Sequence, residues 1–523
     1  MRPHRDPVRH RRAGGGGRAA AWPGIGPHPF PEHLADVHPR AGRPGRRRVV
    51  RTSADVVVVG GGIAGLSVAR ALHLAGRDVI LLEAAPRWGG VIRTETVGDF
   101  VIEAGPDSIL AQKPEGLALC RAVGLADRLI PTNPTTRAIF VLYRGRLHAL
   151  PEGMMLAVPT RAAPLLRSGL FSWPGKLRMG LDLVLPRGPA VADESIASLV
   201  RRRFGAEAVE RLGEPLLAGI HAGDPERLSI RATFPRFVEL EARHRSLIRG
   251  LWARKVPSPG GGSAFYSLAG GLGELVDAVV ARLPADRRRT SARVTSLARH
   301  AANLRLTLAD GTTVGARAVV LAVPAPTAAP LLAPLSGEAG AILGSIPFAS
   351  SATVALAYRR EDVAHPLDGY GLVVPRGEGL RSSACTFVST KFAGRAPAGH
   401  VLLRAFLGGT RDPDVLGLDD AGLVGIVRGE MGRVLGLSGA PVLERVFRWP
   451  RATPQMEVGH LDRIRRLEAI VAGLPGVFLT GAGLRGTGLP DTIADAQRAA
   501  ASAGAFLEAA PTSIHVVTSI QGV

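Results

Sequence analysis

The sequence predicts an α/β protein (α+β overall), in which a dinucleotide-binding domain is joined to a mixed β-sheet domain and a helical insertion. Three observations support this fold class. A valine-rich strand leads into a glycine turn and a helix near residue 60, helical periodicity fills residues 150 to 250, and strand-like alternation dominates residues 345 to 450. With 523 residues, of which 46% are hydrophobic, the chain is long enough for two or three domains.

The first element is a strand, turn and helix of the Rossmann type. The strand Asp55–Val59 leads into a Gly-x-Gly-x-x-Gly turn, and apolar residues at helical spacing follow. The first glycine permits the tight turn, the second lets backbone approach a pyrophosphate, and the third lets helix and strand pack closely. Amide groups at the helix start then face the anion. The candidate contacts in this motif are Gly60, Gly61, Gly62, Ile63, Ala64 and Gly65.

The second strand, Asp78–Leu82, ends in an acid that selects the nucleotide. Glu83 lies 21 residues after Gly62, where a carboxylate accepts hydrogen bonds from ribose hydroxyls and disfavours a 2′-phosphate. The spacing therefore favours FAD or NAD over NADP. The alternative is an ordinary glycine turn without a ligand, which the combined strand, helix and acid make much less favourable.

The next segment distinguishes FAD from NAD. The paired glycines Gly89 and Gly90 follow Glu83 closely, and the strand that begins at Phe100 ends in a Gly-Pro turn. This run resembles the flavin amine oxidase superfamily, in which the paired glycines contact FAD and the Gly-Pro turn lies beside the isoalloxazine. Glu103 is a candidate base, although a solvated or salt-bridged carboxylate is favoured. The FAD contacts expected here are Glu83, Ala84, Arg87, Gly89, Gly90, Gly105, Pro106, Asp107 and Ser108.

A C-terminal strand, turn and helix is expected to complete the cofactor site. The strand Val477–Thr480 meets a glycine-rich turn, and a helix runs from about Pro490 to Phe506. A helix N-terminus aimed at the flavin would stabilise negative charge on it by up to about 2 kcal/mol. The alternative is a capped helix with no ligand. The residues expected to contact FAD are Gly481, Thr487, Gly488 and Leu489.

The remaining elements follow from periodicity. Helices are expected at Ile196–Phe204, up to Leu283 after the glycines at 270–273, and near 420–435. The other expected strands are Val294–Leu297, Leu304–Leu308, Ala318–Val323, Ala352–Tyr358, Gly371–Val374 and Val401–Leu407.

Charge and cysteine content exclude several classes of function. The net charge is +21, but residues 1–51 alone hold twelve arginines against three acids. We expect residues 1–53 to be a disordered basic tail, or the product of an over-extended start site, rather than a functional basic arm. Arginine is used almost exclusively over lysine, which is typical of genomic base composition, and no nucleic-acid motif is present. The two cysteines, Cys120 and Cys385, are far apart, which argues against a disulfide framework or a metal site and favours a reducing compartment.

No apolar run reaches the ~18 residues of a membrane-spanning helix. The segment Met154–Arg187 alternates apolar and basic residues and could lie on an anionic bilayer surface. Burial against the flavin domain is slightly favoured. The expected location is therefore cytoplasmic, with peripheral contact on the inner face of the membrane as the alternative.

Several further stretches resemble the oxygen-dependent porphyrinogen oxidases of haem biosynthesis, which act on protoporphyrinogen or coproporphyrinogen. The similarity extends from about Asp55 to Leu507. Its most specific part is the run from Glu214 to Asp224. The other stretches are Gly105–Ser108, Leu147–Pro151, Ala232–Pro235, Gly270–Leu272 and Gly486–Asp491.

The resemblance implies a flavin domain made of residues 54–135, 255–325 and 455–510. It implies a substrate domain at 136–150 and 326–454 and a helical domain at 151–254. Beyond the similarity, a flexible C-terminus is expected at 511–523. Val294 joins the FAD contacts by position, and Tyr370, Gly371 and Val373 line the tetrapyrrole pocket. Ile139 stands where some members carry a propionate-binding arginine, and the nearby Arg137 is the candidate replacement. Attachment of FAD is expected to be non-covalent, because both cysteines lie far upstream of the C-terminal flavin segment.

The implied reaction is oxidation of coproporphyrinogen III or protoporphyrinogen IX to the porphyrin, by hydride transfer to flavin N5 with molecular oxygen as final acceptor. No catalytic side chain is required, since the flavin carries the chemistry, and His148 and His221 are interpreted as structural. The expected partners are a tetrapyrrole and oxygen, with no nucleic acid and no metal; a homodimer is compatible with the sequence. The rival functions are an amine oxidase or polyene desaturase, and a non-catalytic flavin-binding partner protein.

Overall fold

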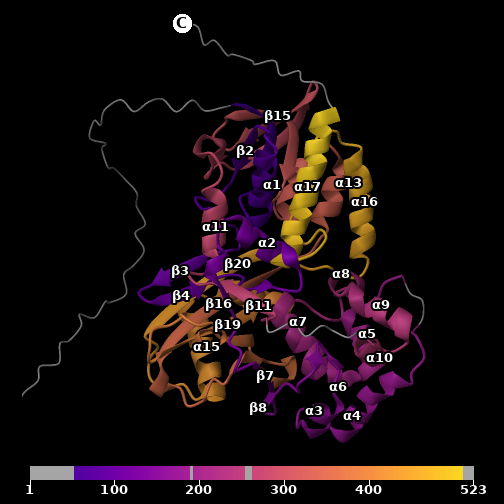
Figure 1. Cartoon of the computed structure of the whole chain (residues 1–523), viewed down its shortest axis with the longest axis vertical. Coiled ribbons are helices and arrows are strands. Elements are labelled where there is room, and N and C mark those ends of the chain that lie inside the picture. The colour runs from indigo at the N-terminus through magenta and orange to yellow at the C-terminus, as the bar shows by residue number, and fades with distance from the viewer. Residues whose placement is uncertain (1–51, 189–191, 254–261, 510–523) are drawn as a thin grey trace, which may run out of the picture. The chain divides into compact units, whose positions relative to one another are not determined.

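The computed structural model describes residues 52–188, 192–253 and 262–509 (Figure 1). The expected N-terminal tail lies outside these ranges except for Thr52 and Ser53, and so does the expected C-terminal segment 511–523. Two seven-stranded sheets organise the described part of the chain. A parallel core in one sheet and mixed pairing in the other confirm the predicted fold class.

The first sheet contains the predicted Rossmann-type strands. Its strands, in spatial order, are β12 (Arg288–Arg289), β2 (Val79–Leu82), β1 (Ser53–Val59), β15 (Thr313–Leu321), β14 (Asn303–Leu308) and β13 (Val294–His300), with β21 (Val477–Leu479) also paired to β15. Strand β15 pairs with β1 along one side. On its other side, its first half pairs with β14 and its second half with β21. Strands β12, β2, β1, β15 and β21 are parallel, so their carboxyl ends meet at one edge of the sheet.

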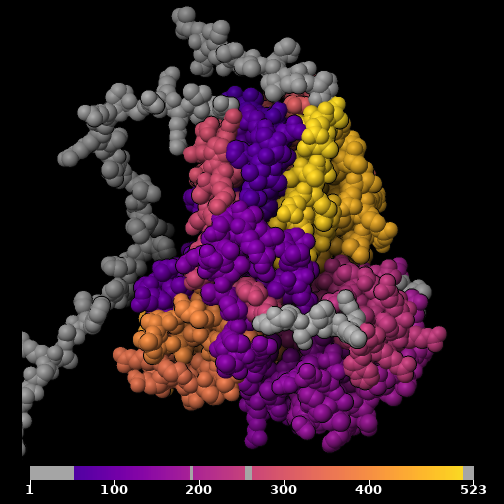
Figure 2. Space-filling model, viewed as in Figure 1, coloured from indigo at the N-terminus to yellow at the C-terminus, as the bar shows by residue number. Residues whose placement is uncertain are grey.

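Helices cover both faces of this sheet. Alternate valines of β1 belong to different cores, with Val56 and Val58 on one face and Val57 and Val59 on the other, as the two-residue period of a strand requires. The first face packs on α1 (Ile63–Leu74), α2 (Pro114–Ala122), α11 (Gly273–Val280) and α17 (Leu489–Ala509). The second packs on α12 (Ala325–Leu332), α13 (Gly337–Gly344) and α16 (His460–Ala472). Figure 2 shows α1 and α17, from opposite ends of the sequence, side by side.

The second sheet is mixed. Its order is β20 (Leu443–Pro454), β16 (Phe348–Arg359), β19 (His400–Gly408), β18 (Ser382–Phe387), β17 (Gly369–Val373), β7 (Ala138–Tyr143) and β8 (Arg146–Ala149), and only β17 and β7 run parallel. Helix α15 (Asp420–Leu435) covers one face through Leu423, Val427 and Met431. The short helix α14 (Val388–Lys391) follows β18.

The predicted helical insertion is present. It contains α3 (Ala162–Arg167), α4 (Trp173–Gly180), the single-turn helix η2 (Leu181–Leu183), α5 (Ile196–Phe204), α6 (Ala206–Ala208), a π-helical turn η3 (Val209–Gly213), α7 (Glu214–His221), α8 (Ile230–Thr233), α9 (Pro235–His244) and α10 (Leu247–Ala253). An ion cluster lies in its core, where the buried Arg203 is paired with both Asp182 and Glu241. The pKa of Glu241 is lowered to about 2, because hydrogen bonds from two arginines outweigh the opposing effect of burial.

Three small sheets complete the fold. They are β3 (Thr94–Val97) with β4 (Phe100–Glu103), β5 (Ile109–Leu110) with β11 (Phe265–Leu268) and β6 (Leu129–Pro131), and β9 (Met154–Met155) with β10 (Val158–Pro159). Among the described residues, no helix is both long and apolar enough to cross a bilayer.

Candidate cofactor and substrate site

The carboxyl edge of the parallel sheet brings the N-terminal and C-terminal motifs together. The amide of Gly60 donates to Leu82 O at 2.7 Å, and the amide of Ala322 donates to Val59 O at 2.8 Å. On the other side of β15, the amide of Thr480 donates to Leu321 O at 3.1 Å. The turns that follow β1, β15 and β21 are thus locked side by side.

The glycine turn after β1 separates a packing role from a binding role. A Cβ on Gly65 would lie 1.8 Å from Gly60 O, so this glycine is required where helix and strand touch. A Cβ on Gly62 would meet nothing closer than Gly90 Cα at 4.0 Å, and Gly62 has an unstrained φ of −73°. Space is therefore left open at Gly62, where a pyrophosphate is expected beside the first amides of α1.

Glu83 is held at the end of β2 by the turn itself. Its Oε2 accepts from the Gly61 amide at 2.5 Å, and its Oε1 accepts from the Ala85 amide at 2.7 Å. The Ala292 amide donates to Glu83 O at 2.8 Å, which places the start of β13, with Val294, next to this acid. A carboxylate fixed in this way retains lone pairs for two ribose hydroxyls.

The paired glycines form the wall opposite Gly62. Gly89 is bridged to Gly62, and both Gly89 and Gly90 have positive φ, at 104° and 60°. Arg87 ties this loop down by donating to Gly90 O at 2.5 Å and to Ile92 O at 3.2 Å. Burial lowers the pKa of Arg87. Arg87 thus shapes the loop through its hydrogen bonds to backbone carbonyls.

The Gly-Pro turn is clamped to the second sheet. A Cβ on Gly105 would lie 2.0 Å from Val91 O, so this turn packs directly on the glycine-pair loop. Arg404 of β19 donates to Gly105 O at 2.8 Å and to Asp107 at 3.0 Å, and Lys391 also contacts Asp107 at 3.0 Å. The two cations hold the pKa of the Asp107 carboxyl well below its usual range, despite burial. Ser108 Oγ donates to the same carboxylate at 2.8 Å.

Glu103 has a structural role. Its carboxylate is buried and accepts from the Leu272 amide at 2.6 Å and from Thr94 Oγ1 at 2.8 Å. Burial raises its pKa, partly offset by these hydrogen bonds. The expectation that Glu103 is solvated is wrong, because its carboxylate is buried and binds the glycine turn before α11.

The C-terminal segment is organised by Asp495, which is 1% exposed. Its Oδ2 accepts from Thr480 Oγ1 at 2.8 Å and from the Gly481 amide at 3.2 Å, and its Oδ1 accepts from Arg485 at 2.6 Å. Thr487 and Gly488 are half-buried immediately before α17. The predicted helix N-terminus therefore starts at the carboxyl edge, at Leu489.

A row of cross-strand neighbours runs across the second sheet from the Gly-Pro turn. Arg404 pairs with Thr386, Thr386 with Gly371, and Gly371 with Ile139. Cross-strand partners project from the same face, and Arg404 shows that this face meets the flavin turn. The guanidinium of Arg404 is bound to Asp107 and to backbone carbonyls. The other three members, Thr386, Gly371 and Ile139, carry no charge, and we call them the uncharged row.

The next row on the same face contacts the helical insertion. It consists of Phe406, Ala384, Val373 and Val141. A Cβ on Gly219 of α7 would lie 3.5 Å from Ala384 Cβ and 3.8 Å from Val373 Cγ1. Val373 is thus a packing residue between sheet and insertion, whereas Ile139, Thr386 and Phe406 remain half-exposed.

The other substrate candidates have local partners. Tyr370 donates its hydroxyl to Asn133 O at 2.7 Å, and a Cβ on Gly371 would lie 2.3 Å from Cys385 O. Arg137 is exposed at the start of β7, with its Nε donating to Pro134 O at 3.0 Å. It is therefore not fixed to the uncharged row.

The two histidines differ in their surroundings. The ring of His148 is tilted against that of Tyr143, with ring centroids 6.0 Å apart and an angle of 59° between the planes. His221 ends α7, its ring centroid is 5.8 Å from that of Phe234, and its carbonyl accepts from Gln455 at 3.0 Å. Burial lowers the pKa of His221 to about 4, although the residue keeps some accessible surface. It is neutral at pH 7.

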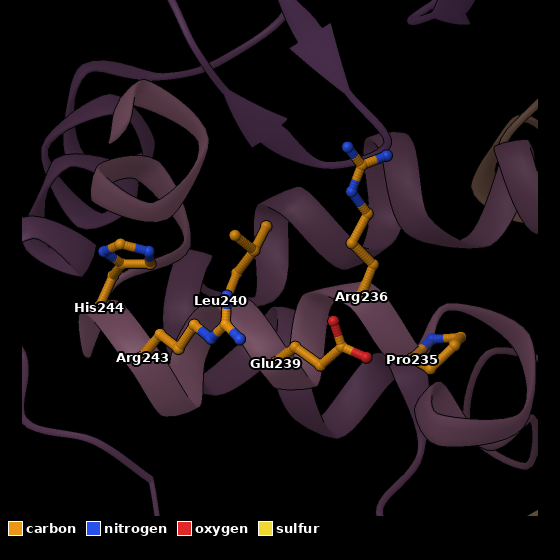
Figure 3. A pocket seen from close by; sticks show the side chains of 6 residues that line it. All are labelled: Pro235, Arg236, Glu239, Leu240, Arg243 and His244. Atoms are coloured by element: carbon orange, nitrogen blue, oxygen red, sulfur yellow. The ribbon is translucent and has the colours of Figure 1, made fainter. Parts of the chain in front are cut away.

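Two surface hollows lie apart from these residues. One, of about 340 Å³, runs along α9 between Pro235 and His244 (Figure 3). The other, of about 510 Å³, lies between α16 and α17 over β21 and includes Leu479 and Phe506. Neither contains a predicted site residue. Within the described ranges, no group of three His, Cys, Asp or Glu residues could hold a metal ion.

Sequence reasoning missed Arg404, Lys391 and Asp495. A signal was present for two of them: Arg404 interrupts the apolar strand Val401–Leu407, and Asp495 lies on the apolar face of α17. Lys391 follows β18 in a short helix and has no such signal.

The residues at the carboxyl edge fit FAD. Gly62 leaves a space that a Cβ would enter, Glu83 is fixed for the ribose, and the glycine-pair loop continues into a turn bound to the second sheet. A dinucleotide with a ring system at that turn matches this sequence of features.

Comparison with known proteins agrees with this site. The family model described as "Flavin containing amine oxidoreductase" matches residues 63–503. Coproporphyrinogen III oxidase of Bacillus subtilis is 36% identical, covering 86% of this chain and 98% of its own. The chloroplastic protoporphyrinogen oxidase of Oryza sativa subsp. japonica is 33% identical over 87% of this chain and 89% of its own.

A solved structure shows the same fold. The putative protoporphyrinogen oxidase from Exiguobacterium sp. 255-15 superposes with a TM-score of 0.76 at 32% identity, covering 87% of this chain and 98% of its own. The chain therefore belongs to the flavin containing amine oxidoreductase family, and it is an FAD-dependent oxidase.

Proposed function

We propose that this enzyme oxidises a porphyrinogen, either coproporphyrinogen III or protoporphyrinogen IX, to the porphyrin in haem biosynthesis. The observation that carries the proposal is the uncharged row of Thr386, Gly371 and Ile139, which starts at the turn expected to hold the flavin. A porphyrinogen is a broad, largely apolar ring, so it fits such a face. The relatives of nearly full length that are named for these two substrates support the same choice.

The chain's own residues bind and orient in this proposal. Gly62 and the facing Gly90 leave room for the pyrophosphate, and Glu83 accepts from the ribose hydroxyls. Arg404 holds the Gly-Pro turn against the sheet that carries the uncharged row, so cofactor and substrate are positioned by one hydrogen-bonded unit.

FAD, when bound, supplies the hydride acceptor, and molecular oxygen is the proposed final electron acceptor. The residues near the uncharged row do not need to act as a base, because the pyrrole N–H protons can leave after the hydride. The lowered pKa of His221, about 4, makes it a weak base. The Glu103 carboxylate is occupied by the Leu272 amide and the Thr94 hydroxyl, and both observations agree with this division of labour. The reaction is proposed to take place in the cytoplasm, where Cys120 and Cys385 stay reduced.

The test is anaerobic mixing of the FAD-loaded protein with each porphyrinogen in turn. Loss of the visible flavin absorption band with one of them, followed by porphyrin fluorescence when oxygen is admitted, is expected. Amines and phytoene serve as comparison substrates. Bleaching by an amine or a polyene, and by neither porphyrinogen, would reject the proposed function.

A further inference from the structure

His460 is a fully buried histidine at the first position of α16. Its Nε2 lies 3.1 Å from the carbonyl oxygen of Leu484. A carbonyl can only accept, so Nε2 must carry the proton and donate it. Burial lowers the pKa of His460, whereas hydrogen bonding to the carbonyls of Leu484 and Gly483 acts to raise it. The ring is thus a neutral donor that faces one turn of backbone.

That turn joins β21 to α17, where contacts with FAD are expected. We call residues 480–488 the C-terminal flavin turn. Two of its glycines, Gly481 and Gly483, have positive φ values of 132° and 90°, and glycine backbone has more accessible conformations than that of any other residue. Inside the turn, the Gly483 amide donates to Gly486 O at 2.7 Å. Contacts from outside the turn are therefore needed to select one conformation.

Two buried side chains supply such contacts at different points of the turn. Asp495 fixes its beginning, where it accepts from Thr480 Oγ1 at 2.8 Å. His460 fixes its middle, through Leu484 O. Asp495 belongs to α17 and so to the flavin domain itself, whereas His460 begins a helix that approaches the turn from the helical insertion.

The segment immediately before α16 is bonded to that insertion. The Ser229 amide donates to Met456 O at 2.8 Å, and the Val458 amide donates to Arg227 O at 2.9 Å. Figure 1 shows the lower end of α16 next to α8, a helix of the insertion. The position of His460 along the chain is therefore set by the insertion.

Asp193 of the insertion adds a side-chain contact to the residue next to His460. Its Oδ2 accepts from the Gly459 amide at 3.1 Å, and its Oδ1 accepts from Ser229 Oγ at 2.8 Å. Both oxygens of this carboxylate are thus used to join the insertion to the start of α16.

Gln455 continues the same segment toward α7. It is buried, and its Nε2 donates to His221 O at the end of α7 at 3.0 Å. Helix α7 is the one that packs on the second sheet through Gly219. Residues 455–460 therefore contact both the helix beside the substrate sheet and the C-terminal flavin turn.

We propose that His460 is a positioning residue for the flavin. Its Nε2 proton holds the C-terminal flavin turn in the conformation that FAD requires, and its place at the end of residues 455–460 ties that turn to the helical insertion. Without this donor, the turn populates other conformations, and the apparent affinity for FAD falls with the fraction of the correct one.

The test compares His460→Met with His460→Gln. The two side chains have the same length, but only glutamine has an amide N–H that can reach Leu484 O. In titrations followed by flavin fluorescence, His460→Met should bind FAD about tenfold more weakly, and His460→Gln should bind within about twofold of wild type. The midpoint potential of the bound flavin is the second readout. It should fall in His460→Met and recover in His460→Gln, because the turn leads into the α17 N-terminus, which favours negative charge on the reduced ring.

Asp193→Asn tests the connection to the insertion. Asparagine has one acceptor oxygen where Asp193 uses two. Alone, this substitution should weaken FAD binding about threefold. Added to His460→Met it should cause no further loss, because the connection is already broken. Fully additive losses would show that the insertion does not act through His460.

His365→Met is the matched control. His365 also bonds to backbone, since its Nδ1 accepts from the Leu367 amide at 3.0 Å, but it lies beside the second sheet. Its FAD affinity should equal that of wild type. Thermal unfolding of each apoprotein verifies folding, and His460→Asn, whose amide is too short to reach the turn, replaces His460→Met if that variant does not fold. Wild-type FAD affinity in the variant without a donor, or equal losses in it and in His460→Gln, would overturn the proposal. These measurements use FAD alone, so they do not depend on the oxidised substrate.

Discussion

The substitution Gly62→Val is expected to weaken FAD binding while leaving the fold stable. In the structure, a Cβ at this position has no neighbour within 4.0 Å except Gly90 Cα, and φ is −73°, which any residue adopts. Without cofactor, the added Cβ meets no steric conflict, and the expected cost is a poorer helix N-cap, worth up to about 1 kcal/mol. With FAD, the valine side chain occupies space intended for the pyrophosphate. Overpacking of 1–3 kcal/mol corresponds to about five- to 150-fold weaker binding.

Gly65→Ala is the informative contrast. A Cβ there would lie 1.8 Å from the backbone oxygen of Gly60, which cannot move without shifting the first strand and helix. This variant should lose about 3 kcal/mol or more of stability even as apoprotein.

The assay combines thermal unfolding of each apoprotein with FAD titration by flavin fluorescence. The expected result for Gly62→Val is a melting temperature near that of wild type with much weaker FAD binding. For Gly65→Ala, the larger effect is expected on the melting temperature of the apoprotein and the smaller effect on FAD binding. Wild-type FAD affinity in Gly62→Val would refute the placement of the pyrophosphate. A Gly65→Ala apoprotein as stable as wild type would refute the packing argument.

Three further outcomes are expected. Asp107→Asn should lower the free energy of unfolding in urea by about 3–5 kcal/mol, because it leaves two cations buried without their carboxylate. Since the folded pKa of Asp107 is lowered, the stability that this carboxylate provides is present above about pH 4 and lost at lower pH. A variant with unchanged stability would contradict the role of Asp107 in holding the turn. The folded pKa of His221 is lowered to about 4, so its contribution to folding stability is complete above about pH 6.5 and falls as pH drops toward 4. His221→Phe should reduce the slope of stability against pH in this window by up to about 1.4 kcal/mol per pH unit. An unchanged slope would count against burial of the neutral ring. Burial raises the pKa of Cys120 to about 11 and of Cys385 to about 12, so a thiol reagent at pH 8 should label neither in the native protein and both after denaturation, and rapid native labelling would show that one of them is accessible.

The sequence was sufficient for the cofactor half because its signals are local. Strand, glycine turn and helix lie within about twenty residues, and each glycine is required by a contact inside that unit or by the ligand. The expected strand Asp55–Val59 is observed as Ser53–Val59, and the expected helix follows it as Ile63–Leu74. The C-terminal helix was equally accessible, because Pro490 and Asp491 mark its first turn.

The substrate half was less predictable because its contacts join distant strands. Tyr370, Gly371 and Val373 were placed by resemblance alone, and the register shows that only Gly371 lies in the row that begins at Arg404. Arg137 was chosen for its nearness in sequence to Ile139. In a strand, however, a separation of two residues fixes only the face, and Arg137 precedes the strand at an exposed position.

Arg404 connects the residues expected to bind the cofactor with those expected to bind the substrate. Its guanidinium binds the carbonyls of Glu103 and Gly105 and the carboxylate of Asp107. Its strand, β19, pairs with the strand of Thr386, where the uncharged row starts. A shift of strand β19 is therefore transmitted to the Gly-Pro turn through these hydrogen bonds. Such rigid coupling suits a reaction in which distance and angle between two rings replace an acid or a base. A substitution at this arginine should then weaken FAD binding and substrate binding together, whereas a change at Ile139 should affect substrate alone.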